Sequence, residues 1–250
     1  MPALFLEISF LKFLIVVPTY NEIQNLRGLM ENIFQVVDKE SHRFDIEKVG
    51  VLIVDDNSPD GTGALADELA QHNPRIGVLH RQKKNGLGKA YLAGFAWGLK
   101  EGYDVLCEMD ADFSHNPIYL VDFWRLLKDH DVVVGSRYVA GGGVKNWGVG
   151  RKIISRGGSV YARSILGMNI RDMTGGFNAW KKEVFDKVEL DKVESEGYAF
   201  QIELKWKAWK HGFKIVETPI VFEDRTAGAS KMSKKIVVEA MLRVAGMRLG

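Results

Sequence analysis

Residues 49–62 read VGVLIVDDNSPDGT, and this stretch decides the fold. Its first part, Val49–Val54, is an apolar run of strand length, which is typical of a strand buried on both faces of a sheet. Polar residues follow, and Asp60 or Thr62 then opens a helix that we expect to reach Ala70. A buried strand that leads directly into a helix is the repeating unit of a parallel sheet covered by helices.

The same unit recurs on both sides of this stretch. A strand at Phe13–Val17 ends at Pro18, and Asn21 is the expected N-cap of a helix with apolar residues at helical spacing from Ile23 to Phe34. Strands are also expected at 76–80, 104–109 and 131–135, with helices at 88–99 and 117–128 between them. Strand and helix alternate four times, which predicts an α/β fold with a mostly parallel central sheet flanked by helices.

The rhythm changes after Gly135. Residues 140–150 contain a glycine cluster and are predicted to form a loop. The elements expected beyond it are a basic helix at about 151–167, a strand at 175–180, a helix at 198–210, a strand pair at 215–222 interrupted by Pro219, and an amphipathic helix at about 233–249. We find no repeat, low-complexity tract or linker, so residues 1–250 are expected to form a single domain with this last helix attached.

Composition excludes several classes of protein. The chain has 250 residues and a net charge of +2, from 34 basic and 32 acidic residues, which argues against a nucleic-acid binder that relies on bulk charge. Cys107 is the only cysteine, so no internal disulfide can form and a reducing, cytoplasmic environment is expected. The apolar run at 3–17 is interrupted by Glu7 and Lys12 and is too short for a spanning helix, so we expect no transmembrane segment.

Acidic residues follow two of the predicted strands. They are Asp55 and Asp56 after the second strand, and Asp110 and Asp112 after the fourth. Ligands of open parallel sheets bind at the carboxyl ends of the strands. Helix capping is the ordinary interpretation of polar residues there, but it explains four crowded carboxylates poorly because like charges repel. A metal ion or a sugar nucleotide would relieve that repulsion.

The sharpest of these features is Asp110-Ala111-Asp112. Two carboxylates separated by one residue at a turn can face the same hard cation. Mg²⁺ and Mn²⁺ prefer oxygen ligands and usually share their coordination shell with substrate phosphates. A lone D-x-D is weak evidence, but its position directly after an apolar strand favours a Mg²⁺ or Mn²⁺ site.

Six motifs together carry a resemblance to a known family. They are VVPTYNE at 16–22, VDDNSPDGT at 54–62, NGLGKA at 85–90, MDADFSHNP at 109–117, VVGSRY at 133–138 and RTAGASK at 225–231. Their order and spacing resemble glycosyltransferase family 2, and within it the dolichol-phosphate or polyprenol-phosphate mannosyltransferases. The resemblance covers roughly residues 12–235. It implies a GT-A-like nucleotide-sugar-binding fold.

The resemblance also implies roles for individual residues. The residues that would border the nucleotide or read its base and ribose are Pro18, Tyr20, Glu22, Val54, Asp56 and the backbone of Ala111. Asp110 and Asp112 would bind the metal that bridges the diphosphate. Arg137, Arg225 and Lys231 would contact phosphate groups, and Asp112 and Arg137 are the expected catalytic residues. The small residues between Arg225 and Lys231 suit a lid over the donor.

Two positions qualify this assignment. Some relatives carry glutamine two residues beyond the D-x-D, where it helps to bind the metal, and here that position is Ser114, a weaker ligand. Glu196 stands where many inverting relatives place a catalytic carboxylate. A phosphate monoester has a second pKa of ~6 and is mostly dianionic at neutral pH, so such an acceptor needs no general base. We therefore interpret Glu196 as structural.

The reaction implied by the resemblance is an inverting transfer of mannose from GDP-mannose to a polyprenyl (dolichyl) monophosphate. A polyprenyl-phosphate glucosyltransferase that uses UDP-glucose is the nearest alternative. A phosphatase of the haloacid dehalogenase type also has a D-x-D after a strand, but there the motif follows the first strand of the core. A nucleotide-binding regulatory subunit is a third possibility, against which the intact D-x-D, Arg225 and Lys231 argue.

Positive charge is concentrated in two segments. Residues 145–171 contain six basic side chains and no acidic one, and the tail from Arg225 has one acidic residue, Glu239. Apolar residues accompany both segments, as in helices that lie on a membrane surface. An ordinary amphipathic helix packed on the sheet is the alternative. Many relatives append spanning helices that are absent here, so we expect peripheral binding to the cytoplasmic face of a membrane, or a separate membrane-anchoring protein, and no nucleic-acid partner.

Overall fold

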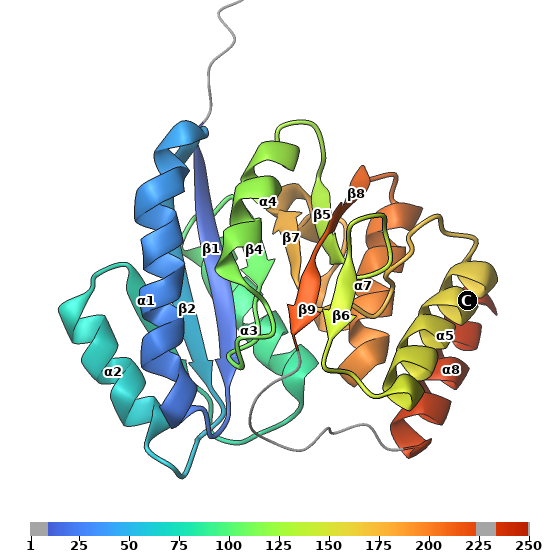
Figure 1. The fold of residues 1–250 in the computed structure, drawn as a ribbon, viewed down its shortest axis with the longest axis horizontal. Coiled ribbons are helices and arrows are strands. Elements are labelled where there is room, and N and C mark those ends of the chain that lie inside the picture. The colour runs from blue at the N-terminus through green and yellow to red at the C-terminus, as the bar shows by residue number, and fades with distance from the viewer. Residues whose placement is uncertain (1–9, 224–233, 250) are drawn as a thin grey trace, which may run out of the picture.

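The computed structural model describes residues 10–223 and 234–249. Its strands are β1 (Leu11–Thr19), β2 (Ile46–Asp55), β3 (Ile76–His80), β4 (Val105–Glu108), β5 (Val132–Ser136), β6 (Gly143–Lys145), β7 (Asn178–Lys181), β8 (Ile215–Pro219) and β9 (Val221–Glu223). Its α-helices are α1 (Ile23–Glu40), α2 (Thr62–His72), α3 (Leu87–Lys100), α4 (Leu120–Leu126), α5 (Val149–Leu166), α6 (Lys182–Phe185), α7 (Gly197–Lys210) and α8 (Lys234–Leu249). The alternation of helix and strand is visible in Figure 1.

A seven-stranded sheet forms the centre of the fold, in the order β3-β2-β1-β4-β7-β5-β8. β1 pairs in parallel with both β2 and β4, and β5 pairs in parallel with β8. Only β7 runs antiparallel to its neighbours in this sheet. The mostly parallel sheet expected from the sequence is therefore confirmed, and the carboxyl ends of β1, β2, β4 and β5 lie on one edge.

Helices cover both faces of this sheet (Figure 1). On β1, Phe13, Ile15 and Val17 face one hydrophobic cluster, which α1, α2 and α4 complete. Leu14 and Val16 face the opposite cluster, which contains residues of α3, α6 and α7. Successive side chains of a strand point to opposite faces, so a strand that is apolar at every position has to be buried on both sides.

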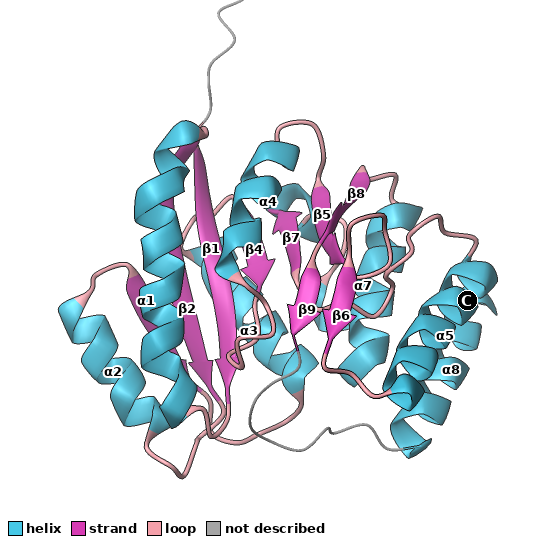
Figure 2. Cartoon of the chain, in the orientation of Figure 1, coloured by secondary structure: helices cyan, strands magenta, loops and turns pink. Residues whose placement is uncertain are grey.

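The glycine-rich stretch at 140–150 contains a strand that the sequence analysis missed. Residues Gly143–Lys145 form β6 and pair in parallel with β9 in a separate two-stranded sheet (Figure 2). Gly142 leaves no room for a side chain, because an added Cβ would lie 2.5 Å from the carbonyl oxygen of Ser136. This strand is set by a distant partner and not by a local apolar pattern, so the prediction of a loop was wrong here.

The predicted N-cap at Asn21 was also wrong. Asn21 adopts a left-handed conformation with φ of 62°, and Glu22 takes the N-cap position. The first amides of α1 are satisfied by the turn after β2 instead. The N–H of Glu22 donates to Thr62 Oγ1, and that of Ile23 donates to Asp60 Oδ2. Helix α1 is therefore capped from a neighbouring unit, which local sequence reasoning cannot detect.

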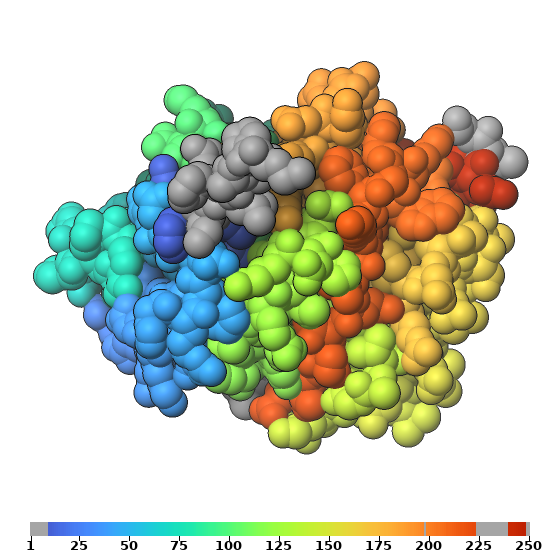
Figure 3. Space-filling model, turned by 90° about the horizontal axis from the view of Figure 1, so that it is seen from above, coloured from blue at the N-terminus to red at the C-terminus, as the bar shows by residue number. Residues whose placement is uncertain are grey.

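Helix α5 lies at the end of the molecule opposite α2 (Figures 1 and 3), and a third hydrophobic cluster includes its residues Ala162 and Leu166. It joins α5, α7 and α8 through residues that include Leu166, Ile202 and Val244. Val244 is fully buried there, so at this position α8 packs against the protein as an ordinary amphipathic helix. Within 10–223 and 234–249, no helix combines the length and hydropathy needed to cross a membrane.

Candidate functional site

Both aspartates at the end of β2 have partners within the protein. Asp55 accepts hydrogen bonds from the hydroxyls of Thr19 and Ser58. Asp56 forms an ion pair with Arg81, and although burial raises the pKa of Asp56, the attraction of Arg81 opposes that rise. The repulsion that the sequence analysis expected among four carboxylates is thus partly relieved by the protein itself.

The other residues predicted at the nucleotide lie around this turn. Thr19 at the end of β1 pairs in register with Asp55, which brings Pro18 and Tyr20 to the same edge of the sheet. Val54 is completely buried, so its side chain belongs to the core and only its backbone can face a ligand. The ammonium of Lys84 lies 3.6 Å from the centre of the Tyr20 ring. Sequence reasoning did not identify Lys84.

The two aspartates of the D-x-D occupy a tight turn directly after β4. Phe113 takes φ of 62°, a left-handed conformation that is unusual for a bulky residue. The N–H of Ser114 donates to Asp112 Oδ1, and the hydroxyl of Tyr91 on α3 donates to Asp110 Oδ1 at 2.9 Å. Asp110 and Asp112 are partly exposed, while Ala111 between them is buried.

These two carboxylates fit a Mg²⁺-type site. Such a site typically takes one or two carboxylates and completes its shell with substrate phosphates and water. In the described part of the chain, no group of three His, Cys, Asp or Glu side chains is arranged to hold a metal without a substrate. Two aspartates at an exposed turn are the donor set expected for a metal that arrives with a diphosphate.

His115 supports the backbone of the D-x-D turn. Its Nδ1 accepts a hydrogen bond from the N–H of Asp110, and its ring stacks on Phe177 at 4.8 Å. Burial lowers the pKa of His115, so the ring is neutral at pH 7 and its protonated nitrogen is Nε2. His115 is 2% exposed and thus belongs to the core.

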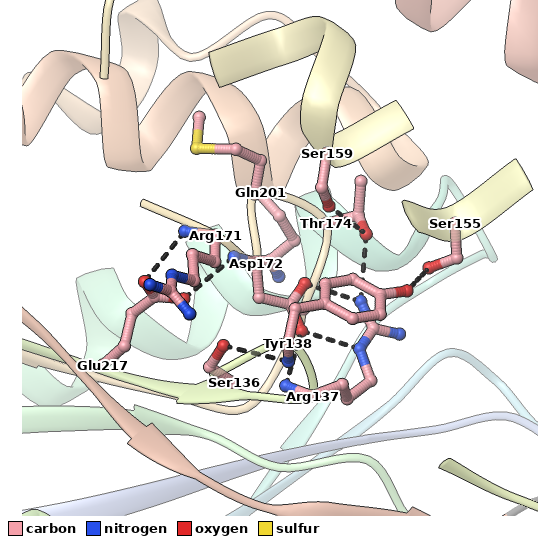
Figure 4. Close-up of polar contacts among 12 residues, drawn as sticks. Ser136, Arg137, Tyr138, Ser155, Ser159, Arg171, Asp172, Thr174, Gln201 and Glu217 are labelled. Atoms are coloured by element: carbon pink, nitrogen blue, oxygen red, sulfur yellow. Dashed lines mark hydrogen bonds and ion pairs between the residues drawn. The ribbon is translucent and has the colours of Figure 1, made fainter. Parts of the chain in front are cut away.

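Arg137 follows β5 and is held by Asp172 (Figure 4). Its Nε and Nη2 donate to Oδ2 and Oδ1 of Asp172, both at 2.7 Å, and its backbone N–H donates to Oδ2 at 2.9 Å. Nη2 also donates to Thr174 Oγ1 at 2.9 Å. Arg137 is 6% exposed and Asp172 is 0% exposed. A two-pronged pair of this kind fixes the guanidinium plane as well as its position.

A second arginine lies on the same indole ring as Arg137. The guanidinium carbons of Arg137 and Arg151 are 5.4 Å and 4.0 Å from the centre of the Trp147 ring. Tyr138 also lies beside Arg137, and its hydroxyl donates to Ser155 Oγ on α5 (Figure 4). Guanidinium groups suit the binding of phosphate and carboxylate groups, so this region is a candidate anion site.

An apolar pocket of about 260 Å³ adjoins this anion site, between α5, α7 and α8. Its lining includes Tyr161, Ile202 and Val244, together with Ser155 and Thr174. The last two are the same residues that bind Tyr138 and Arg137. The structure therefore joins an apolar pocket to the surroundings of a fixed guanidinium.

The remaining predicted site residues are distributed as follows. Glu22 takes the N-cap position of α1 and accepts a hydrogen bond from Asn25. Glu196, which precedes α7, is about half exposed and forms an ion pair with Lys89. Ser114 is buried and its amide supports Asp112. Arg225 and Lys231 lie outside the described residues.

Sequence reasoning missed Asp172 and Thr174, which hold Arg137. They belong to RDMTGGFN at 171–178, a stretch with polar residues and two adjacent glycines but no recognisable spacing for catalysis. Gly175 allows the chain to pass close to Asp172, since an added Cβ would lie 3.2 Å from its carboxylate. The signal that the sequence offered was the glycine pair Gly175-Gly176, which follows closely after Asp172.

The fold and the site place the chain among the glycosyltransferases with a GT-A-like fold. A model of glycosyl transferase family 2 matches residues 14–189, and the chain belongs to this family. It is 49% identical over 237 residues to the polyprenol monophosphomannose synthase of Mycolicibacterium smegmatis, covering 93% of this chain and 85% of the relative. It is 45% identical over 234 residues to the undecaprenyl-phosphate mannosyltransferase of Micrococcus luteus, covering 94% and 93%.

Solved structures share the fold at low sequence identity. Glucosyl-3-phosphoglycerate synthase from Mycobacterium tuberculosis, in complex with Mn²⁺ and UDP-glucose, matches with a TM-score of 0.65 and 18% identity over 94% of this chain and 79% of that one. The mannosyltransferase PcManGT from Pyrobaculum calidifontis, in complex with GDP-Man and Mn²⁺, matches with a TM-score of 0.53 and 14% identity, covering 95% and 73%. The GT-A-like fold expected from the sequence is confirmed.

Proposed function

We propose that this enzyme transfers mannose from GDP-mannose to the phosphate of a polyprenyl monophosphate, with inversion at the anomeric carbon. The two curated relatives, which align with more than nine tenths of the chain, bear the names of polyprenyl-phosphate mannose transferases. The observation that carries the proposal is the fixed guanidinium of Arg137 beside an apolar pocket. A site of that kind suits an acceptor with an anionic head and an apolar chain.

In the proposed reaction, an oxygen of the acceptor phosphate attacks the anomeric carbon of mannose. The bond between that carbon and the β-phosphate oxygen of the donor breaks, and GDP leaves. A phosphate monoester with a second pKa of ~6 arrives mostly as a dianion, so no proton has to be removed. Arg137 and Arg151 would attract and orient that dianion, and Glu196 is not needed as a base.

The leaving diphosphate needs positive charge. Asp110 and Asp112 would hold a Mg²⁺ or Mn²⁺ ion, which would supply that charge when bound. The PcManGT complex contains GDP-Man together with Mn²⁺, which supports the same pair of ligands here. Arg225 and Lys231, outside the described residues, are proposed to contact phosphate groups as part of a lid.

The proposed nucleotide site is the edge formed by β1 and β2. Tyr20 would cover the base or ribose, and Asp56 would bind a polar edge of the nucleoside. Pro18, Glu22 and the backbones of Val54 and Ala111 complete this set. Asp56 is 6% exposed, and its pairing with Arg81 holds its carboxylate in one place.

We further propose that residues 1–250 act as one catalytic domain that binds the cytoplasmic face of a membrane peripherally. On α5, Val149, Ile153 and Val160 are 73%, 66% and 51% exposed. Lys152 and Arg156 are exposed on the same helix. Apolar and basic side chains together on an exposed helix favour anionic lipid. A separate membrane-anchoring protein could strengthen this attachment.

Transfer assays with the purified protein test the proposed function. We expect mannose to move from GDP-mannose to a polyprenyl monophosphate, with loss of activity in a chelator and no product with the free polyprenol. A parallel assay with UDP-glucose tests the alternative donor. Efficient transfer to the free alcohol would make Glu196 a candidate base. Failure with the phosphate acceptor would reject the proposal.

The phosphatase alternative is weaker. It expects a nucleophilic D-x-D after the first strand of the core, whereas Asp110 and Asp112 follow β4. The hydrogen bond from Tyr91 and the turn at Phe113 also commit these carboxylates to a fixed geometry at the rim. Release of phosphate from a simple phosphomonoester by the purified protein would be the result in its favour.

A further inference from the structure

A lysine ammonium is buried next to the segment that holds Arg137. Lys205 on α7 is 0% exposed, and its Nζ donates to the carbonyl oxygen of Gly175 at 2.7 Å and to that of Met173 at 3.3 Å. Burying an ammonium group is unfavourable unless its hydrogen bonds are satisfied. Both of these acceptors belong to the main chain, so the contact fixes a stretch of backbone.

A carboxylate accepts hydrogen bonds from backbone amides of the same stretch. Glu217 on β8 accepts hydrogen bonds from the backbone N–H of Arg171 and of Asp172, each at 2.8 Å and each to a different oxygen (Figure 4). Hydrogen bonds to charged groups are about twice as strong as those between neutral groups. The backbone of 171–175 is thus held at its amides by a negative group and at its carbonyls by a positive one.

This segment carries the two side chains that bind the guanidinium of Arg137. Asp172 accepts three hydrogen bonds from Arg137, and Thr174 accepts a fourth. Ser159 on α5 contacts Thr174 through its hydroxyl at 3.4 Å. A shift of the segment would therefore move Asp172 and Thr174 together and turn the guanidinium.

We propose that Lys205 and Glu217 are positioning residues for Arg137. They fix the segment 171–175, and through Asp172 and Thr174 they hold the guanidinium beside the apolar pocket. This inference rests on the proposed function, because it takes Arg137 as part of the acceptor site. It assigns Lys205 and Glu217 to the acceptor half of the reaction and not to the donor half.

A purely structural role for Lys205 is the alternative. Glu108 on β4 is also 0% exposed, and Asn178 donates to its Oε2 at 2.6 Å and to the Gly175 carbonyl at 3.0 Å. Lys205 could serve only to balance this buried carboxylate. In that case its loss would lower stability and leave the balance between donor and acceptor kinetics unchanged.

Steady-state kinetics of Lys205→Met and Glu217→Gln separate the two roles. We expect each variant to raise the KM for a short-chain polyprenyl phosphate about tenfold, the size of one lost hydrogen bond to a charged group. The KM for GDP-mannose should stay within about twofold of the wild-type value. Lys207→Met is the matched control, because Lys207 lies on the same helix and donates to the Lys192 carbonyl at 2.6 Å, away from Arg137.

A spectroscopic measurement makes the test independent of activity. The Nε–H of Arg137 donates to a buried carboxylate, so its ¹H–¹⁵N signal should be well resolved and slow to exchange. Arg137→Lys assigns that signal. We expect it to shift or broaden in Lys205→Met and in Glu217→Gln, and to stay unchanged in Lys207→Met.

The two measurements distinguish an error in the proposed function from an error in the positioning role. If the wild-type protein does not use a polyprenyl phosphate but the Nε–H signal responds as expected, the proposed function is wrong and the positioning role stands. If the signal and the acceptor KM are both unchanged in Lys205→Met and Glu217→Gln, the positioning role is overturned. Should Lys205→Met fail to fold, Glu217→Gln decides whether fixing the segment 171–175 positions Arg137, because it keeps the size and shape of the side chain.

Discussion

Arg137 and Asp172 form a buried, two-pronged ion pair in which both side-chain hydrogen bonds measure 2.7 Å. The two residues come from different parts of the fold, since Arg137 follows β5 and Asp172 precedes β7. The pair is therefore both a link between segments and a support for a functional cation. Its loss should affect stability and the acceptor site together.

Asp172→Asn should test both consequences. Removing the charge of one partner leaves the other charge buried and uncompensated, which typically costs about 3 kcal/mol of unfolding free energy. We also expect a higher KM for the acceptor, because the guanidinium is no longer fixed. Urea denaturation and steady-state kinetics measure the two effects. An unchanged midpoint with unchanged kinetics would show that the pair has neither role.

The same pair should give a pH-dependent contribution to stability. Burial alone would raise the pKa of Asp172, but the attraction of Arg137 and its hydrogen bonds, with a contribution from Lys205, leave that pKa below the ordinary value. A carboxyl group whose pKa is lowered on folding stabilises the protein above the pKa of the unfolded chain, about 3.9, and loses that contribution as the pH falls. The stability difference between wild type and Asp172→Asn should thus be constant near neutral pH and shrink below about pH 4. A difference that grows on acidification would contradict this sign.

The metal site should depend on both aspartates of the D-x-D. Asp110→Asn and Asp112→Asn each remove an anionic oxygen ligand, so each should abolish transfer and weaken the Mn²⁺-dependent binding of GDP-mannose. Isothermal titration with and without Mn²⁺ measures the binding separately from catalysis. Full activity in the presence of a chelator, or in either variant, would eliminate the metal assignment.

Tyr91 should tune that site through Asp110. Tyr91 is fully buried, stacks on Phe200 and donates its hydroxyl hydrogen to Asp110. Tyr91→Phe keeps the ring and removes only this bond, and the loss of such a supporting contact typically weakens metal binding about tenfold or more. Mn²⁺ affinity, measured by electron paramagnetic resonance in the presence of GDP, is the direct readout. Tyr103→Phe is the control for loss of a phenolic hydroxyl from a largely buried tyrosine.

The first half of the fold could be predicted from the sequence because its signals are local. Val49–Val54 and Phe13–Val17 are apolar at nearly every position, and each is followed by a helical pattern. Strand β6 and the capping of α1 could not be predicted in this way. Both depend on partners far away in the chain, namely β9 and the pair Asp60 and Thr62.

The residues of the candidate site also differ in whether a local sequence pattern identifies them. Asp110 and Asp112 are a compact motif directly after a strand, and the structure brings them to the expected edge of the sheet. Asp172 and Lys205 carry no such motif, because their importance comes from contacts that only the folded chain creates. Val54 illustrates the opposite case, since the family resemblance implied a role at the nucleotide while its side chain serves the core.

Membrane binding should depend on charge in α5 and α8. Lys152 on α5 is exposed, and Lys234 begins α8. Reversing both to glutamate should weaken binding to vesicles that contain anionic lipid, because each basic residue near such a surface contributes about 1 kcal/mol. Activity on a long-chain polyprenyl phosphate in those vesicles should fall in proportion. Activity on a short, water-soluble acceptor should change little, because such an acceptor does not have to be taken up from the vesicle surface.

A matched variant separates this effect from a simple change in net charge. Lys39 and Lys100 are exposed at the ends of α1 and α3, and reversing both changes the net charge by the same amount. Vesicle sedimentation at low and high salt should show weaker, salt-sensitive binding only for the Lys152 and Lys234 variant, because exposed charges are screened over about 8 Å at physiological ionic strength. Equal losses in both variants would point to a non-specific charge effect. If the wild-type protein does not bind vesicles at low salt, α5 and α8 have no direct role at the membrane and the lipid has to be delivered by another route.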